Sequence, residues 1–194
     1  MFHVRHSLLI PVLLFAGGAT SRAQTFNPTN GHYYEIVTTP ASWTDANTAA
    51  SARIFNGANG YLGTITSQNE LDFLTTAFGL PALNHLIIGG FQSDGQSAPD
   101  AGWQWVTGET WSYTNWNVGE PNDGGSGIEL DRENRIVLNS DASWNDVPSF
   151  TPGFYLVEYT PAADTPEPGM LAMLGGLGVS GAAFAQRRRR ARKA

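Results

Sequence analysis

The part of the sequence that decides the fold is a tryptophan-rich stretch followed by two short polar motifs: Trp111-Ser112-Tyr113-Thr114-Asn115-Trp116, then Glu120-Pro121-Asn122, then Trp144-Asn145-Asp146. The chain has 194 residues, and all six tryptophans lie between Trp43 and Trp144. This aromatic content is enough to build a hydrophobic core, and it argues against an intrinsically disordered chain. Glycine, asparagine, aspartate and serine are frequent around these motifs, which predicts a long loop region with little regular structure.

Outward from this stretch, hydrophobic periodicity predicts two helices early in the chain and several strands, most of them late. Ser42 or Thr44 can cap the first helix. Ser67 and Glu70 form a capping box for the second helix, and Gly79 ends it. The expected strands are residues 31–37, 61–65, 86–90, 103–106, 135–138 and 153–159. This order indicates an α+β domain.

The charge of residues 24–165 restricts the classes of partner that this part of the chain can bind. Residues 24–165 contain sixteen acidic residues, three arginines and no lysine. Nucleic acid is therefore excluded as a partner, because phosphate binding needs clustered basic side chains. Dense carboxylates are better suited to binding cations. The chain has no cysteine, so disulfides, cysteine-ligated zinc and thiol catalysis are excluded as well.

Both ends of the chain have the composition of targeting segments. Residues 1–23 combine a polar start, an apolar run from Ser7 to Ala19 that is too short to span a bilayer, and small residues before an expected cut after Ala23. We expect a signal peptide here, and the alternative is a buried helix of the fold. Residues 163–194 contain Pro166-Glu167-Pro168, then an uncharged apolar stretch, then an arginine-rich tail that should stay cytoplasmic.

This three-part tail resembles the PEP-CTERM sorting signal of Gram-negative bacteria that produce exopolysaccharide. The resemblance implies a short transmembrane helix, transient anchoring in the inner membrane, recognition by a processing protease of exosortase type, and cleavage near Pro166-Glu167-Pro168. The mature protein would then be released to the cell surface or extracellular matrix. An ordinary C-terminal membrane anchor is the alternative. In both cases residues 24–162 would work outside the cytoplasm, where free calcium is plentiful.

The motifs of residues 30–160 resemble, in their order, those of a C-type lectin-like domain. The remaining stretches that carry this resemblance are Gly31-His32-Tyr33-Tyr34, Trp43-Thr44-Asp45-Ala46, Gly60-Tyr61-Leu62, Ser67-Gln68-Asn69-Glu70, Ile87-Ile88-Gly89-Gly90 and Trp103-Gln104-Trp105. The resemblance implies an α+β C-type lectin-like fold in residues 24–162, with two helices, small antiparallel sheets and a long loop region. The sequence departs from the family in lacking its disulfides and in placing Ile87 where the family has tryptophan.

The same resemblance implies a calcium site that also binds carbohydrate. Its expected ligands are Glu120, Asn122, Glu133, Asn145 and Asp146. Calcium prefers about six to eight oxygen ligands, and these side chains together with the Asp146 carbonyl would supply most of them. The resemblance also implies a cis peptide bond between Glu120 and Pro121.

Two ligand assignments stay open. Glu133 stands eleven residues before Trp144, as in the calcium-binding members of the family, whereas Glu129 is nearer to the family's usual distance from Glu120-Pro121-Asn122. We prefer Glu133 and keep Glu129 as the alternative. Asp94 and Asp123 resemble ligands of a second calcium, but a turn-forming role is the interpretation that we prefer for each of them.

A calcium ion with open coordination positions can bind two vicinal hydroxyls of a sugar. In the family, the order Glu-Pro-Asn goes with mannose-, glucose- or fucose-type sugars. The resemblance therefore implies a calcium-dependent lectin whose partner is a surface or matrix polysaccharide. The alternative is a lectin-like structural or protein-binding domain without sugar affinity. No motif indicates a catalytic carboxylate pair or a nucleophile beside His32 or His85, so we expect no enzymatic activity.

Overall fold

The computed structural model describes residues 23–93, 96, 98–124 and 132–161. Apart from Ala23, the predicted signal peptide lies outside the described residues. The predicted sorting segment from residue 163 on, Asp94 and Glu129 lie outside them as well. The chain divides after Thr160 into two units, and the first of them contains every described helix and strand. Within the described ranges, no helix is long and apolar enough to cross a membrane.

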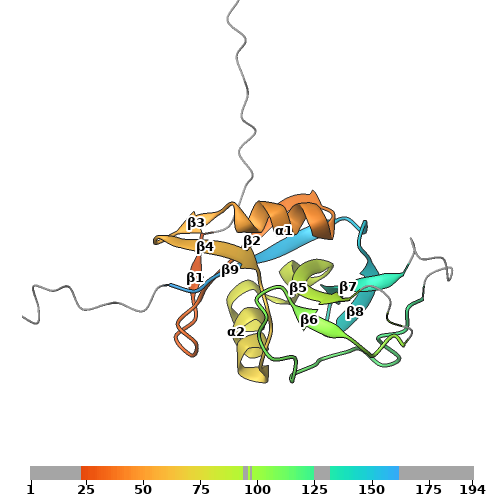
Figure 1. Ribbon diagram of the computed structural model, residues 1–194. Coiled ribbons are helices and arrows are strands. Elements are labelled where there is room, and N and C mark those ends of the chain that lie inside the picture. The colour runs from red at the N-terminus through yellow and green to blue at the C-terminus, as the bar shows by residue number, and fades with distance from the viewer. Residues whose placement is uncertain (1–22, 94–95, 97, 125–131, 162–194) are drawn as a thin grey trace, which may run out of the picture. The chain divides into compact units, whose positions relative to one another are not determined.

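Nine strands form one connected sheet in the described part of the chain (Figure 1). They are β1 (Thr25–Phe26), β2 (Tyr33–Ala41), β3 (Ile54–Phe55), β4 (Ala58–Leu62), β5 (Leu86–Gln92), β6 (Trp103–Trp105), β7 (Glu133–Leu138), β8 (Trp144–Pro148) and β9 (Gly153–Tyr159). The main path runs β1-β2-β9-β5-β7-β8, while β4 also pairs with β9 and β6 with β5.

The expectation of small antiparallel sheets needs one correction. Strand β9 joins the early and the late strands, because it pairs antiparallel with β2 and β4 and parallel with β5. Both β5 and β9 are apolar along almost their whole length and bury side chains on both faces. Such strands are stable in the middle of a sheet, between neighbours, rather than at the edge of a small one.

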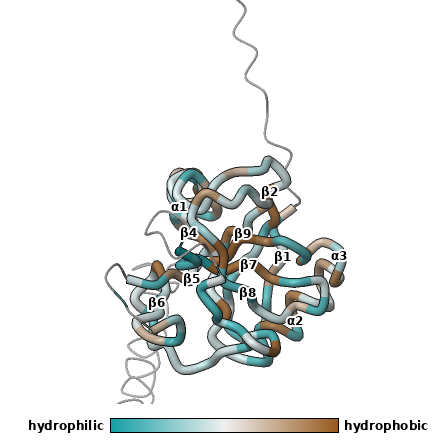
Figure 2. The backbone as a smooth tube through the Cα atoms, turned by 90° about the vertical axis from the view of Figure 1, so that its right-hand side faces the viewer, coloured by the Kyte–Doolittle hydropathy of each residue, from teal (hydrophilic) through white to brown (hydrophobic). Residues whose placement is uncertain are grey.

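Each main helix covers a different face of the sheet. Helix α1 (Trp43–Ser51) packs into a cluster that includes Val37, Ile87 and Val157. Helix α2 (Gln68–Phe78) packs into a cluster that includes their sequence neighbours Ile36, Ile88 and Leu156. Successive strand residues point to opposite faces, so these two clusters lie on the two sides of the sheet. Figure 2 shows the hydrophobic stretches gathered in the middle of the domain.

The expected serine caps are confirmed, whereas the Glu70 side chain of the expected capping box accepts the Thr66 N–H (2.7 Å) in place of the Ser67 N–H. The Ser42 side chain accepts the Asp45 N–H (3.2 Å), and the Ser67 side chain accepts the Glu70 N–H (3.3 Å). Gly79 ends α2 with a positive φ of 79°, which glycine adopts without steric cost. The short helix α3 (Leu80–Leu83) and the strand β8 were not expected from the sequence.

A buried polar cluster ties the first and last long strands to α2. Glu158 of β9 is 1% exposed and accepts hydrogen bonds from Tyr34 (3.0 Å) and from the backbone N–H of Thr64 (2.9 Å). His32 Nδ1 lies 2.5 Å from the same carboxylate, and the Tyr34 hydroxyl also lies 2.5 Å from Glu70. These bonds satisfy carboxylates that would otherwise be costly to bury.

Aromatic packing holds the long loop region without disulfides. The rings of Trp111 and Trp105 are 4.7 Å apart, those of Trp103 and Trp116 are 4.9 Å apart, and Trp116 lies 5.6 Å from Trp144. Trp103, Trp105 and Trp144 belong to the hydrophobic core, and the partly buried Trp111 and Trp116 pack against it. Buried aromatic contacts of this kind replace the missing covalent links as the anchor of the loop.

Candidate functional site

Three segments carry the five predicted ligands. Glu120 and Asn122 lie in the loop before β7, Glu133 is the first residue of β7, and Asn145 and Asp146 are in β8. Strands β7 and β8 pair antiparallel, with Ile136 opposite Asp146. The strand character of residues 144–148 was missed, although the buried Trp144 and Val147 on either side of the motif are a signal for it.

A tight turn presents the first motif. The Glu120 N–H donates to the Asn117 carbonyl (3.0 Å), and Gly119 between them has a φ of 92°, which favours glycine. The Asn117 N–H in turn donates to the Trp144 carbonyl (2.9 Å), so the turn is attached to β8. The peptide bond between Glu120 and Pro121 is cis, as the family resemblance implied.

The Asp146 side chain binds the backbone that follows Glu120 and Pro121. Its side chain is 0% exposed and accepts the backbone N–H groups of Asn122 (3.1 Å) and Asp123 (2.9 Å). The neighbouring Asn145 amide donates to the Asp146 carbonyl (2.8 Å). Hydrogen bonds from backbone N–H groups to a carboxylate are strong, so Asp146 fixes the backbone of residues 122 and 123 to strand β8.

The carboxylates of the site repel one another. Burial raises the pKa of Glu120 to about 7, helped by a hydrogen bond with Asp146 and by the negative charges of Asp146 and Glu133. The Glu120 Oε2 atom is buried and has no hydrogen-bond partner. Burial and the charges of Asp146 and Asp123 also raise the pKa of Glu133, although the Gly124 N–H opposes this shift. Glu120, Glu133 and Asp146 therefore lie within electrostatic reach of one another.

Gly124 brings two further ligand atoms together. Its N–H donates to Glu133 Oε2 (2.6 Å). A Cβ atom at Gly124 would lie 2.5 Å from Asn122 Oδ1 and 3.1 Å from Glu133 Oε2, so these two oxygens are close to each other. Glu133 is thus positioned with the other predicted ligands, whereas its alternative Glu129 lies outside the described residues. A side chain at position 124 would occupy the space between the two oxygens.

Asp123 has a role of its own that sequence reasoning missed. Its side chain accepts the Glu133 N–H (2.9 Å) and forms an ion pair with Arg132 (3.1 Å). Arg132 also donates to the Gln96 carbonyl. The ion pair closes the loop between Gly124 and Arg132, and the opposite charges of Asp123 and Arg132 were the available sequence signal. The second calcium site stays a prediction, and Asp123 would have to exchange Arg132 for the ion.

No group of three or more histidine, cysteine, aspartate or glutamate side chains in the described ranges is arranged to hold a metal ion. The three carboxylates of the predicted set, Glu120, Glu133 and Asp146, therefore do not form such a group in this structure. Carboxylate, amide and backbone oxygens are the ligands that calcium prefers. The donor chemistry of the site therefore fits calcium, and the ligand set stays a prediction.

Comparisons with known proteins show which class of protein this chain is similar to. No family model matches the chain. Halomucin of Haloquadratum walsbyi is 31% identical over 150 residues, which cover 69% of this chain and 2% of halomucin. Human C-type lectin domain family 4 member G is 34% identical over 98 residues, which cover 47% of this chain and 28% of that protein. The chain thus spans only a small part of these curated relatives.

Solved structures agree with this class. The mouse scavenger receptor C-type lectin carbohydrate-recognition domain superposes with a TM-score of 0.58 at 22% identity, over 72% of this chain and 96% of that chain. The protein has an α+β C-type lectin-like fold, with two main helices and a mixed sheet. The solved structures therefore assign the fold of a C-type lectin-like domain to this chain. Every described helix and strand lies within residues 24–161, so this stretch is a sound unit for experiments.

Proposed function

We propose that the domain is a calcium-dependent carbohydrate-binding module for mannose-, glucose- or fucose-type sugars. One observation carries the proposal: Glu120, Glu133 and Asp146 come from three separate segments, and the charges of Asp146 and Glu133 help to raise the pKa of Glu120. Carboxylates that face each other in this way favour either protonation or a bound cation. A calcium ion would neutralise them and use the buried Glu120 Oε2 as a ligand.

Sugar would bind through the same ion. Calcium accepts about six to eight oxygens, so a set of five side chains leaves coordination positions for two vicinal hydroxyls. Each hydroxyl could also donate to the Glu120 carboxylate or accept from the Asn122 amide. This order of acceptor and donor supports the mannose-type preference that the family resemblance implies.

A second function is favoured by a specific observation. Asp146 already accepts two backbone N–H groups, and Asp123 is already paired with Arg132. The loop is therefore closed by hydrogen bonds and an ion pair without a cation. This arrangement would suit a lectin-like structural or protein-binding domain that has no affinity for sugar.

Calcium binding is tested by thermal unfolding of residues 24–161. Calcium at about a hundred times its dissociation constant would stabilise the native state by about 2.7 kcal/mol, which raises the melting temperature by about 5–10 °C over the value in chelator. We expect Glu120→Gln and Asn145→Ala to abolish this rise. The matched control Asp100→Asn removes an exposed carboxylate outside the site and should keep it. An unchanged melting temperature at millimolar calcium would refute the metal site.

Sugar binding is tested separately, by retention on immobilised mannan with calcium or with chelator. We expect retention only with calcium, and elution by free mannose but not by galactose. A calcium-dependent melting temperature without retention on any glycan of an array would favour the structural or protein-binding function. Elution by galactose alone would contradict the mannose-type preference.

We also propose that the protein is exported and processed at both ends. The support is the sequence pattern of residues 1–23 and 163–194, both of which suit a bacterial secreted protein. Its partner would then be a polysaccharide of the cell surface or matrix. Mass spectrometry of the protein recovered from the cell surface would test this. The expected product begins at Gln24 and ends near Pro166, and recovery of intact termini would contradict the proposal.

A further inference from the structure

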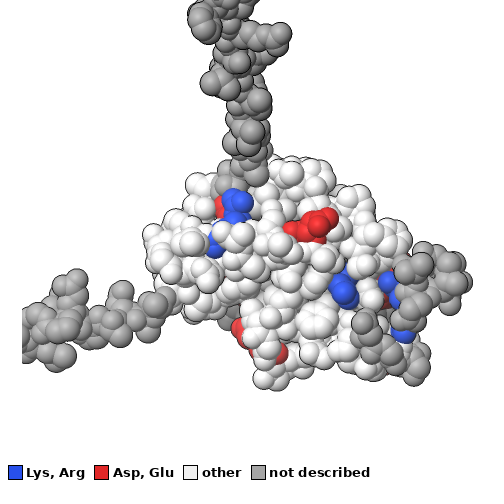
Figure 3. Space-filling view, turned by 45° about the horizontal axis from the view of Figure 1, so that its top comes forward, with Lys and Arg blue, Asp and Glu red and all other residues white. Residues whose placement is uncertain are grey.

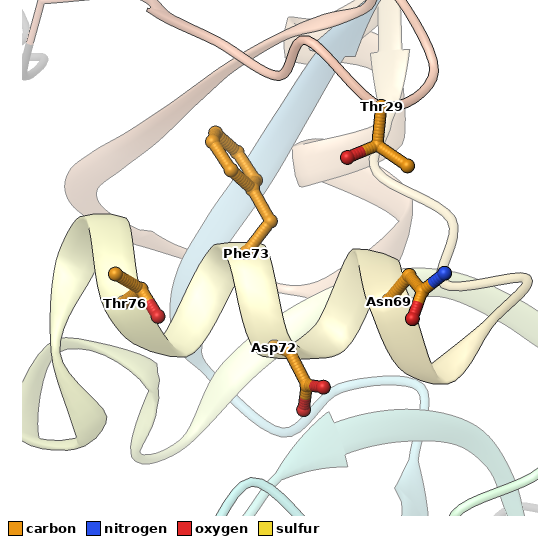
Figure 4. Close-up of a pocket in the computed structure, with 5 residues that line it drawn as sticks. All are labelled: Thr29, Asn69, Asp72, Phe73 and Thr76. Atoms are coloured by element: carbon orange, nitrogen blue, oxygen red, sulfur yellow. The ribbon is translucent and has the colours of Figure 1, made fainter.

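We propose that the outer face of α2 carries a second binding site, independent of calcium, for a neutral saccharide. A pocket of about 340 Å³ is lined by Thr29, Asn69, Asp72, Phe73 and Thr76. Figure 4 shows these five side chains on and beside α2. Four of these residues belong to α2, and Thr29 comes from the turn between β1 and β2. None of them belongs to the candidate calcium site.

The spacing of the lining residues makes one continuous surface. Positions 69, 72, 73 and 76 are three or four apart and so share one face of the helix. Within this polar face Phe73 is only half-buried, although its ring packs against Tyr34 at 5.7 Å. A pyranose ring also combines an apolar C–H face with a hydroxyl edge. Phe73 can contact the apolar face while the surrounding polar groups bond the hydroxyls.

The Asp72 carboxylate of the pocket accepts a hydrogen bond from Gln68, which is itself hydrogen-bonded to the long loop region. Gln68 donates to Asp72 Oδ1 (2.8 Å), and the Tyr113 hydroxyl donates to Gln68 Oε1 (3.0 Å). Tyr113 itself lies edge-on to Trp144 at 5.8 Å. Because Gln68 is fixed by the long loop region, Asp72 is oriented before any ligand arrives. Such preorganisation lowers the entropy that a weak ligand would have to overcome.

The polar groups of the pocket select an uncharged, hydroxyl-rich ligand. Asp72 can accept from two hydroxyls, the Asn69 amide can donate and accept, and the threonines can do both. The pocket's only charge is negative, and residues 24–165 contain no lysine. Anionic sugars would therefore be repelled. Figure 3 shows, on another face of the domain, that charged side chains are few and set among uncharged surface.

The site is tested by nuclear magnetic resonance of ¹⁵N-labelled residues 24–161 in the presence of chelator. The probes are the neutral trisaccharides mannotriose and maltotriose, with trigalacturonate as the anionic counterpart. We expect at least one neutral probe to shift the amide signals of Thr29, Asn69, Phe73 and Thr76 at millimolar concentration. Trigalacturonate should leave them unchanged. The calcium-site variant Asn145→Ala should give the same shifts, so this result does not depend on the calcium site.

Three variants make the assignment specific. Asp72→Asn should weaken binding about tenfold, because it removes a charged hydrogen-bond acceptor. Tyr113→Phe should weaken binding less, because it only removes the hydrogen bond that the Tyr113 hydroxyl donates to Gln68. The control Asp45→Asn removes an equally exposed carboxylate from α1 and should have no effect. The proposal is overturned if neither neutral probe shifts these signals, if the shifts fall in residues 120–146 instead, or if Asp72→Asn binds as well as the control.

Discussion

The ion pair between His32 and Glu158 predicts a pH-dependent stability. His32 Nδ1 lies 2.5 Å from Glu158 Oε1, and the two side chains are 21% and 1% exposed. The hydrogen bond with Glu158 raises the pKa of His32 above its usual 6.5, and the charges of Glu158, Glu70 and Glu109 add to this shift while burial opposes it. The pair therefore contributes its full stability below about pH 6.5 and loses it as the pH rises through the raised pKa.

The substitution His32→Ala measures this contribution. It removes one hydrogen bond to a buried charge, and such bonds are worth about 1.5–3 kcal/mol. The other donors to Glu158, from Tyr34 and Thr64, remain in place. We therefore expect the variant to be destabilised by about 2 kcal/mol near pH 5.5 and by less near pH 9, because the pair loses stability as the pH rises through the raised pKa of His32.

The assay is urea unfolding of residues 24–161, wild type and variant, at both pH values. Taking the difference between them cancels the other groups that titrate in this range. His85→Asn is the matched control, because it removes an exposed histidine outside the cluster and asparagine tolerates the φ of 57° at that position. A destabilisation by His32→Ala that is constant with pH, or that grows as the pH rises, would refute the reasoning.

Two further predictions concern stability. In Gly60→Ala the new Cβ would lie 2.7 Å from the Ala50 carbonyl oxygen and 2.9 Å from atoms of Tyr159 and Val157, so we expect urea unfolding to show a loss of about 1–3 kcal/mol. A loss under about 0.5 kcal/mol would mean that the strands separate there at little cost. Arg53→Met should cost about 3–5 kcal/mol, because its Nε lies 2.5 Å from the fully buried Glu35 carboxylate. Adding Glu35→Gln should restore much of that loss, and strict additivity in this double-mutant cycle would contradict the pairing.

The helices and several of the strands could be predicted because their signals are local. Ser42, Ser67 and Gly79 act within one turn of the backbone, and the structure confirms all three. The strand predicted at residues 153–159 has the observed bounds of β9, since a continuous apolar run needs no partner to be recognised. The cis bond at Pro121 and the core role of the tryptophans were also available, the first through the family resemblance and the second through composition.

Strand β8 and the parallel pairing of β5 with β9 could not be predicted from local sequence signals. Asn145 and Asp146 are poor strand formers, and β8 exists because it pairs with β7 and buries Trp144 and Val147. The parallel contact between β5 and β9 connects residues far apart in the chain. Such contacts depend on the packing of both faces by α1 and α2, which no local window of sequence contains.

The sequence by itself determined the caps and the apolar runs, because each of these depends on a few neighbouring residues, whereas the candidate ligands were named through the family resemblance. Only the tertiary structure decided what surrounds those residues. It put Glu133 and Asp146 close enough to Glu120 to raise its pKa, paired Asp123 with Arg132, and placed the hydrogen-bonded Gln68 and Tyr113 beside Asp72. The physical reason is that electrostatic and hydrogen-bond energies depend on distance in space and on burial, and the folded sheet sets both.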